Sequence, residues 1–439
     1  MKPEQISACF FLQMLVIIAV SRVVGWVGKR FLGQPQVVGE MIAGVLLGPS
    51  LFGAVAPGFQ DALFPKASRD ILYVGAQFGV GLYMFLVGLG LRRDGFRGHG
   101  RSAVVTSLSG MAAPFAAALL VGPWLLGHGL FGKGVGPLQA VLFTGAAISI
   151  TAFPMLARII HERGLSETPI GTLCLTAGAV DDAGAWIVFA IVLASFGGGP
   201  WVAVKAIVGA AVFATFMILL APRLLAPLGR MAERAGKVGP TILAVVLGAF
   251  FLCASAMDSI GLHAVFGGFL LGTAMPRGLL SKELRRQLEP FTVVILLPMF
   301  FTFSGLNTRL GMVGSVEMLL IAGAVLAVSV IAKGGACWAA ARLSGQDNPT
   351  ALAIGALMNS RGLMELILIN LGLQRGIIGP PLFSVLVLMA IMTTLMASPL
   401  FELAYGRRAR AEGTLGALRE EEGDDLPAMM TGGREAPVT

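Results

Sequence analysis

Long apolar segments recur along almost the whole chain, and they constrain the fold more than any other feature of the sequence. A helix needs about 20 predominantly apolar residues to cross the hydrocarbon core of a bilayer. Thirteen candidate runs lie near residues 7–28, 36–54, 70–91, 102–126, 137–160, 168–195, 201–226, 238–257, 261–276, 289–307, 315–342, 350–373 and 381–404. With 56% hydrophobic and 13% charged residues, the chain is too apolar for a water-soluble globular protein. We therefore expect an all-α polytopic membrane protein of about 13 transmembrane helices.

Lysine and arginine gather in the loops on one side of this predicted bundle, where an excess marks the cytoplasmic face. They are Lys29, Arg30, Arg92, Arg93, Arg97, Arg158, Arg163, Arg223, Arg230, Arg234, Lys237, Arg277, Lys282, Arg285, Arg286, Arg342, Arg407, Arg408 and Arg410. This bias predicts an N-terminus outside, a cytoplasmic C-terminus and an odd number of spans. It also accounts for the formal charge of +8 without a nucleic-acid partner. The first run lacks the features of a cleavable signal peptide, so we expect it to be retained.

The composition changes after Tyr405, at the end of the last apolar run. Residues 406–439 are first rich in arginine and then acidic, with few large apolar side chains. Such a segment cannot bury a core, so we expect a disordered cytoplasmic tail and no attached regulatory domain. The four cysteines lack the spacing of a disulfide framework or a zinc site, and we expect no cofactor.

Two adjacent carboxylates, Asp181 and Asp182, stand in the middle of the apolar stretch 172–194. A single carboxylate in that place costs about 2.5 to 3.5 kcal/mol on insertion scales, so two of them require a reason. Adjacent side chains on a helix project about 100° apart and need not share a partner. Their repulsion and partial desolvation favour the protonated form of at least one. The pair predicts a site that holds a proton or a small monovalent cation in turn, with a helix N-cap or a structural ion pair as the alternative.

A lysine, Lys333, lies far from either end of the run 315–342. A lysine buried at that depth pairs with a carboxylate or loses its proton. The alternative is a side chain that extends to the membrane interface.

Polar residues together with proline or glycine interrupt two other runs, 137–160 and 350–373. The interruptions contain Ser149, Thr151 and Pro154 in the first run, and Asn359, Ser360, Arg361 and Gly362 in the second. Discontinuous helices of this kind bind ions in transporters, because their free helix ends face each other at mid-membrane. The second interrupted run follows the first at an offset of seven runs, and this odd offset reverses membrane direction as in an inverted repeat. An ordinary proline kink is the alternative for the first interruption.

Four separated motifs occur in order along the chain. They are Gln34-Pro-Gln-Val-Val-Gly-Glu-Met-Ile-Ala-Gly-Val-Leu-Leu-Gly-Pro49, Ser149-Ile-Thr-Ala-Phe-Pro154, Val180-Asp-Asp182 and Met358-Asn-Ser-Arg-Gly-Leu-Met-Glu-Leu366. In these motifs the chain resembles the cation/proton antiporter 2 family, and the last motif is similar to the plant-type cation/proton exchanger branch. The resemblance covers roughly residues 34–403.

The resemblance implies a sodium/proton antiporter fold and a homodimer. Within residues 1–405, each protomer would hold a core domain with two crossed broken helices and a dimerisation domain. Asp182 would carry the proton and transiently bind Na+ or K+, while Asp181 would pair with Lys333. The polar residues of the breaks would be Ser149 and Thr151 in the first crossed helix, and Asn359, Ser360 and Arg361 in the second.

One position departs from the pattern of many bacterial members, which have glutamate two residues after the arginine of the second break. This chain has Leu363 there, and Glu365 follows two residues later. A pair between Arg361 and Glu365 would have the i,i+4 spacing of a helix.

Glu40, in the first motif, either lines the cytoplasmic approach to the ion site or sits at a hydrated helix end. The four histidines are His263, in a stretch typical of the family, and His99, His128 and His161, which lie near loops. We expect passive interfacial histidines, with tuning of the pH response as the alternative.

These features predict a secondary active antiporter that exchanges Na+ or K+ for H+ across the cytoplasmic membrane by alternating access. The two ions would compete for Asp182, and two carboxylates with one lysine favour electrogenic exchange. The alternatives are a K+ efflux system that lacks its regulatory domain and a cation-coupled carrier of an organic solute. An enzyme is disfavoured, because no nucleophile, base and orienting group stand at recognisable spacing.

Overall fold

The computed structural model describes residues 2–411 apart from 33, 35, 91–99, 164, 166–167, 197–199 and 260–263. In these residues the regular structure is helical, apart from one isolated bridge between Phe131 and Ile378. The predicted all-α class is confirmed. His99, His263 and most of the predicted tail, from residue 412 onward, lie outside the described residues.

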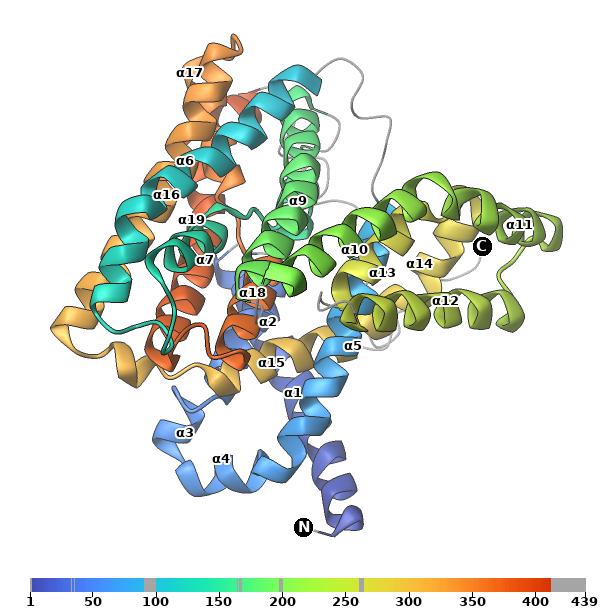
Figure 1. The fold of residues 1–439 in the computed structure, drawn as a ribbon, viewed down its shortest axis with the longest axis horizontal. Coiled ribbons are helices and arrows are strands. Elements are labelled where there is room, and N and C mark those ends of the chain that lie inside the picture. Colours follow the sequence, from blue (N-terminus) through green and yellow to red (C-terminus); the bar gives the residue numbers. More distant parts are fainter. Residues whose placement is uncertain are drawn as a thin grey trace, which may run out of the picture.

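The two interrupted runs form short helices, and the longest helix of the described residues has 32 residues (Figure 1). In chain order they are α1 (Pro3–Leu32), α2 (Gln36–Leu47), α3 (Phe52–Val55), α4 (Pro57–Leu63), α5 (Lys66–Gly90), α6 (Gly100–Gly127), α7 (Pro137–Ser149), α8 (Phe153–Glu162), α9 (Pro169–Ser195), α10 (Pro200–Leu219), α11 (Ala221–Ala235), α12 (Pro240–Ser259), α13 (Ala264–Ala274), α14 (Leu279–Phe291), the π-helix η2 (Thr292–Leu296), α15 (Leu297–Asn307), the 3-10 helix η3 (Leu310–Val313), α16 (Val316–Leu343), α17 (Asn348–Met358), α18 (Leu363–Gln374) and α19 (Pro380–Ala411).

Each predicted apolar run falls on a helix or on consecutive helices. Within the described residues, eight helices are long and apolar enough to cross a membrane, or nine if the pair bent by 41° at the junction of α10 and α11 is one span. The two interrupted runs contain no helix that is long enough to cross a membrane. The first is split into α7 and α8, with 13 and 10 residues, and the second into α17 and α18, with 11 and 12 residues. At 1.5 Å per residue, each half covers about half of a bilayer core of about 30 Å.

The helices form two bundles that lie side by side (Figure 1). In the first, here the core bundle, α6 packs on α7, α9 and α16, and α17 packs on α16 and α19. In the second, here the panel bundle, α5 packs on α13 and α15, and α2 packs on α1 and α15. Helix α10 contacts α9 of the core bundle and α13 of the panel bundle. The polar residues of the two interruptions all belong to the core bundle.

Glycines allow two helices of the panel bundle to touch backbone to backbone. A Cβ atom built on Gly305 of α15 would lie 1.9 Å from the carbonyl oxygen of Gly44 in α2, and one built on Gly44 would lie 2.2 Å from the oxygen of Phe301. Small residues at such crossings permit the close van der Waals packing that holds helices together in lipid. The panel bundle is therefore joined tightly at this crossing.

The last helix continues past the predicted start of the disordered tail. Helix α19 ends at Ala411, so residues 406–411 are helical and the boundary predicted after residue 405 is placed too early. The reason lies in contacts that the composition does not reveal. Arg408 donates to Asp347 at 2.6 Å, and its guanidinium lies 5.7 Å from the centre of the Tyr405 ring.

Candidate functional site

The two interrupted helices cross at their breaks. Helix α7 ends at Ser149 and α8 begins at Phe153, while α17 ends at Met358 and α18 begins at Leu363. The Thr151 hydroxyl donates to the carbonyl oxygen of Met358 at 2.9 Å, which ties one break to the other. A backbone bond from Ala152 N to Ser360 O at 3.0 Å adds a second tie. Two carbonyl ends and two amide ends of helices thus meet inside the core bundle.

Asp181, on α9, lies against the first break. Its Oδ2 accepts hydrogen bonds from the backbone N–H of Thr151 at 2.8 Å and from Lys333 Nζ at 3.0 Å. Its Oδ1 accepts from the Ser107 hydroxyl of α6 at 3.4 Å. Hydrogen bonds from charged and backbone donors to a carboxylate are strong, so these three donors hold the Asp181 side chain against the first break.

Lys333, on α16, is fully buried and does not reach an interface. Besides its ion pair with Asp181, its ammonium group donates to the carbonyl oxygen of Ser149 at the end of α7. A cation at the C-terminal end of a helix is favoured by the partial negative charge there. The structure thus shows the predicted carboxylate partner and rules out the interfacial position in this conformation.

Asp182 is in a different situation from its neighbour. Its side chain is 1% exposed, and neither Oδ1 nor Oδ2 has a hydrogen-bond partner in the described part of the chain. An unpartnered buried carboxylate is costly as long as it is charged. A proton or a bound cation would remove that cost.

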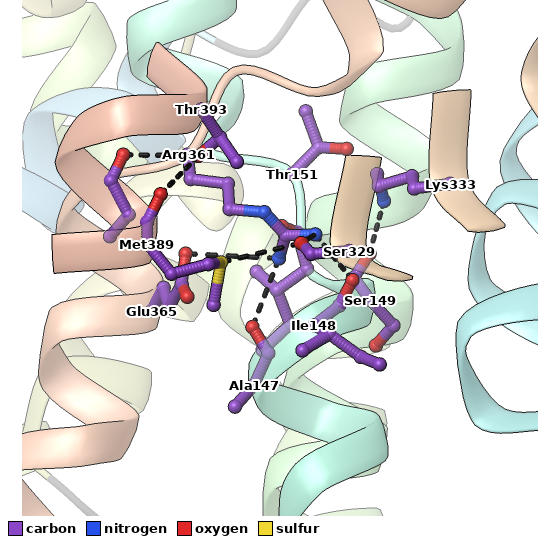
Figure 2. Close-up of polar contacts among 12 residues, drawn as sticks. Ala147, Ile148, Ser149, Thr151, Ser329, Lys333, Arg361, Glu365, Met389 and Thr393 are labelled. Atoms are coloured by element: carbon purple, nitrogen blue, oxygen red, sulfur yellow. Dashed lines mark hydrogen bonds and ion pairs between the residues drawn. The ribbon is translucent and has the colours of Figure 1, made fainter. Parts of the chain in front are cut away.

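Arg361, in the second break, points its guanidinium at the carbonyl end of α7, as Figure 2 shows. NH1 donates to Ala147 O at 2.9 Å and NH2 to Ile148 O at 2.5 Å. NH2 also donates to the Ser329 hydroxyl of α16 at 2.5 Å. The carbonyl groups that α7 leaves free at its end therefore receive Arg361 on one side and Lys333 on the other (Figure 2).

Glu365, in the first turn of α18, has a fully buried side chain. Its Oε2 lies 3.8 Å from Arg361 NH1, the i,i+4 pair for which the sequence spacing allowed. Neither of its oxygens has a hydrogen-bond partner among the described residues.

The remaining polar residues of the second break have distinct contacts. Asn359 donates to Gly355 O at 3.1 Å and to Val330 O at 3.3 Å. Its side-chain oxygen and the buried Ser360 hydroxyl have no partner among the described residues. These oxygen atoms are available beside the crossing of the two breaks.

Glu40 is buried within α2 of the panel bundle, at 2% exposure. It accepts a hydrogen bond from Gln36 at 3.3 Å and lies 4.0 Å from Arg22 NH1. This burial does not fit the hydrated helix end considered above. His128 has a ring nitrogen 2.8 Å from Trp124 O and is 4.0 Å from Glu317, and it has no contact with the site in the described residues.

Sequence reasoning missed three hydroxyl residues of the site. Ser329 accepts from Arg361, Ser107 donates to Asp181, and the Thr394 hydroxyl bonds both the N–H and the C=O of Arg361 at 3.0 and 2.7 Å. Ser329 precedes Lys333 by four residues, so its place on the same helix face could have indicated it. Thr394 belongs to a threonine pair in an otherwise apolar run, whereas nothing distinguished Ser107 from its serine-rich neighbourhood.

Comparison with known proteins places the chain in a family. Residues 17–403 match the family described as sodium/hydrogen exchanger, transmembrane. The chain is 37% identical over 399 residues to the Na(+)/H(+) antiporter NhaS4 of Synechocystis, covering 89% of this chain and 96% of the relative. It is 32% identical over 407 residues to Cation/H(+) antiporter 18 of Arabidopsis thaliana, covering 92% of this chain. Its fold is similar to that of the sodium proton antiporter MjNhaP1 from Methanocaldococcus jannaschii, with a TM-score of 0.67, 14% identity and coverage of 94% and 100% of the two chains.

These matches differ in what they cover. The chain spans nearly the whole Synechocystis relative but 50% of the Arabidopsis relative. The structural similarity confirms the predicted antiporter fold, and the sequence matches confirm the resemblance read from the four motifs. The chain therefore belongs to the sodium/hydrogen exchanger family and is a multi-pass membrane antiporter of monovalent cations and protons, not an enzyme.

Proposed function

We propose that Asp182 is the site that the transported cation and the proton occupy in turn. The observation that carries this proposal is the pair of buried Asp182 oxygens without any hydrogen-bond partner in the described residues. A carboxylate in that position needs a proton or a cation to offset its desolvation. Both ligands satisfy the same oxygens, so binding of one excludes the other.

The adjacent carboxylate supports this assignment by contrast. Asp181 already accepts bonds from Thr151 N, Lys333 Nζ and the Ser107 hydroxyl. A cation at Asp181 would have to displace the Lys333 ammonium group, whereas a cation at Asp182 displaces no protein donor. Asp181 and Lys333 therefore act as a fixed pair that orients the first break.

Further oxygen atoms lie near the crossing of the breaks. Thr151, Asn359 and Ser360 place hydroxyl or amide oxygens beside the two breaks. Hard monovalent cations bind oxygen ligands of this type, and freed helix ends supply them in transporters. In our proposal these residues, with Ser149, line the path of the ion, and Arg361 holds the end of α7 in place.

Exchange would follow from alternating access of this site to the two sides of the membrane. The core bundle carries the site, and the panel bundle is tightly joined at the crossing of α2 and α15. We propose that the core bundle moves against the panel bundle. Such motion has to break contacts between them, including the 3.0 Å hydrogen bond from Asn370 of α18 to Ser304 of α15.

The cation in this proposal is Na+ or K+. Na+ is the first candidate because the Synechocystis relative is named a Na(+)/H(+) antiporter. We also propose a homodimer, as the resemblance to the antiporter family implies. The Lys and Arg distribution supports a place in the cytoplasmic membrane with the N-terminus outside and the C-terminus in the cytoplasm.

The test is transport by purified protein in proteoliposomes that hold a pH-sensitive dye. Addition of Na+ or K+ should release protons through the wild-type protein, and Asp182→Asn should reduce this flux to that of empty liposomes. Glu289→Gln is the matched control, because Glu289 is an exposed carboxylate that pairs with Arg285 at 3.0 Å. Retained cation-driven flux in a folded Asp182→Asn protein would refute the assignment.

A further inference from the structure

Glu365, in the first turn of α18, is a second buried carboxyl group that receives no hydrogen bond. Its side chain is fully buried, and neither of its oxygens has a hydrogen-bond partner among the described residues. Asp182 shows the same two features, and the proposed function gives Glu365 no part. A buried carboxylate without donors is costly, so Glu365 needs a proton, a bound cation or a well-placed basic partner.

The contact of Glu365 with Arg361 lacks the geometry of a strong buried ion pair. Arg361 NH1 lies 3.8 Å from Glu365 Oε2, which is too far for a hydrogen bond. The buried Nε of Arg361 also has no acceptor in the described part of the chain, although Glu365 offers two free oxygens one turn away. An ionised carboxylate beside a guanidinium forms short charge-assisted hydrogen bonds, often two in parallel. Their absence from this contact fits a neutral Glu365.

The pair of Asp181 and Lys333 shows the contrast. A buried ion pair offsets the cost of desolvation when its geometry is good and further hydrogen bonds satisfy the remaining lone pairs. The Asp181 carboxylate lies 3.0 Å from Lys333 Nζ, and Thr151 N and the Ser107 hydroxyl also donate to it. Glu365 meets neither condition.

Arg361 does not depend on Glu365 to offset its own charge. Its guanidinium donates to the carbonyl oxygens of Ala147 and Ile148 and to the Ser329 hydroxyl. The first two belong to the C-terminal end of α7, where the partial negative charge of the helix favours a cation. Arginine keeps its charge in proteins, so Arg361 can remain a cation beside a neutral neighbour.

Few other charges face Glu365. Helix α18 packs on α7 and α19, and neither α7 nor residues 380–401 of α19 contain a titratable side chain. The charge of Lys333 also reaches Glu365, but Lys333 is bonded to Asp181. These two cations and the amide end of α18 favour the ionised form. They supply no hydrogen bond to the Glu365 oxygens among the described residues, so they do not offset the burial of a charge.

The same surroundings admit a proton and exclude a metal cation. A cation at Glu365 Oε2 would lie beside the Arg361 guanidinium, and the two like charges would repel each other. A cation also needs several oxygen ligands in place of its water shell. The carbonyl oxygens of Ala147 and Ile148 are already bonded to Arg361. A proton bonds covalently to one carboxylate oxygen and needs none of these ligands.

We propose that Glu365 is a second proton-binding site, which holds a proton and excludes Na+ and K+. Glu365 is then neutral in this conformation, and the NH1 and NH2 groups of Arg361 stay on the end of α7. Asp182 differs, because Lys333 is bound to its neighbour Asp181 and no basic side chain forms an ion pair with Asp182 among the described residues. A cation can therefore replace the proton of Asp182 but not that of Glu365. The assignment of Glu365 follows from its own surroundings and does not require the proposed role of Asp182.

Infrared difference spectroscopy of the purified protein tests this proposal, because a protonated carboxyl group has a C=O band that a carboxylate lacks. At neutral pH the wild-type protein should show such a band, and Glu365→Gln should lose it. Glu289→Gln, which changes an exposed carboxylate, should keep it. Addition of Na+ or K+ should leave the Glu365 band unchanged and should remove a second band, which Asp182→Asn also removes.

The outcomes separate the two proposals. Absence of any carboxyl band that Glu365→Gln removes would overturn the proton site. Loss of the Glu365 band on addition of Na+ or K+ to the Asp182→Asn protein would overturn the exclusion of cations. A band of Asp182 that does not respond to cations would refute the proposed function and leave the Glu365 site standing.

A second measurement covers the case in which Glu365→Gln does not fold. Among the described residues Glu40 is the other buried glutamate. Glutamate labelled with a heavy carbon isotope can be incorporated into the Glu40→Gln protein. The Glu365 band should then shift while the band of Asp182 stays in place, and a spectrum without a shifted carboxyl band would overturn the proposal.

Discussion

Removing one charge of the Asp181–Lys333 pair should destabilise the protein more than removing both. The two charged atoms are 3.0 Å apart and both side chains are fully buried. At an effective dielectric constant of about 20, unit charges at this distance attract by about 5 kcal/mol, part of which only offsets their desolvation. Loss of one partner leaves the other charge uncompensated, and breaking buried pairs in this way typically costs about 3 to 5 kcal/mol.

A double-mutant cycle measures this interaction. Asp181→Asn keeps an oxygen that can accept from Thr151 N, and Lys333→Met keeps most of the apolar side chain, so each change removes mainly a charge. We expect each single variant to lower the free energy of unfolding by about 3 kcal/mol or more. The double variant should recover at least about 2 kcal/mol of the summed loss. Unfolding in mixed detergent and SDS micelles, followed by tryptophan fluorescence, provides the free energies.

An exposed pair provides the control. Arg286 and Glu283 of α14 are 2.5 Å apart, and Arg286 is 73% exposed. The cycle with Glu283→Gln and Arg286→Met should give a much smaller coupling energy, which falls with added salt. The coupling energy of Asp181 and Lys333 should not change with salt, because the pair is buried. A coupling energy below about 0.5 kcal/mol for Asp181 and Lys333 would refute the reasoning.

Two further predictions concern packing and pH. Gly305→Ala should lower the free energy of unfolding by about 1 to 3 kcal/mol or more, because the new methyl group would meet the Gly44 backbone at 1.9 Å. Gly323→Ala in α16 is the control, because a Cβ atom built on Gly323 would have no neighbouring atom within 4 Å. This variant should be neutral or slightly stabilising in the same unfolding assay. The pKa of Asp347, between α16 and α17, lies below its usual range, chiefly because the Thr350 side chain donates to it and also because Arg408 is close. A lowered carboxyl pKa contributes stability above the ordinary pKa, and this contribution is lost as pH falls through the folded-state pKa. Asp347→Asn should therefore cost less than about 1 kcal/mol at pH 7, since the pair is exposed and screened. The cost should become smaller as pH falls below the ordinary carboxyl pKa. A cost that does not change with pH would contradict the electrostatic explanation.

The sequence by itself determined the membrane class, the positions of the helices and the residues at which two of them break. It could do so because apolar length and the polar and glycine interruptions are local features, and a bilayer imposes a length on every span. Asp181, Asp182 and Lys333 could be identified for the same reason, since a charge in an apolar run is expensive wherever the run packs. The end of α19 was placed too early because the contacts of Arg408 with Asp347 and Tyr405 join distant parts of the chain or depend on the folded geometry.

Only the tertiary structure decided how the charges are shared. Asp181 has hydrogen-bond partners because its side of α9 faces the break after α7 and Lys333 of α16. The positions of these helices relative to α9 therefore decide which of the two adjacent carboxylates is paired. The use of Arg361 to hold the carbonyl end of α7, with Ser329 and Thr394 around it, joins residues from four separate runs. Glu365 departed in the sequence from the pattern of many bacterial members, and in the fold it is buried beside Arg361. Electrostatic energies depend on distance and burial in three dimensions, so the partners, and with them the net charge of the site, are set by packing and not by position along the chain.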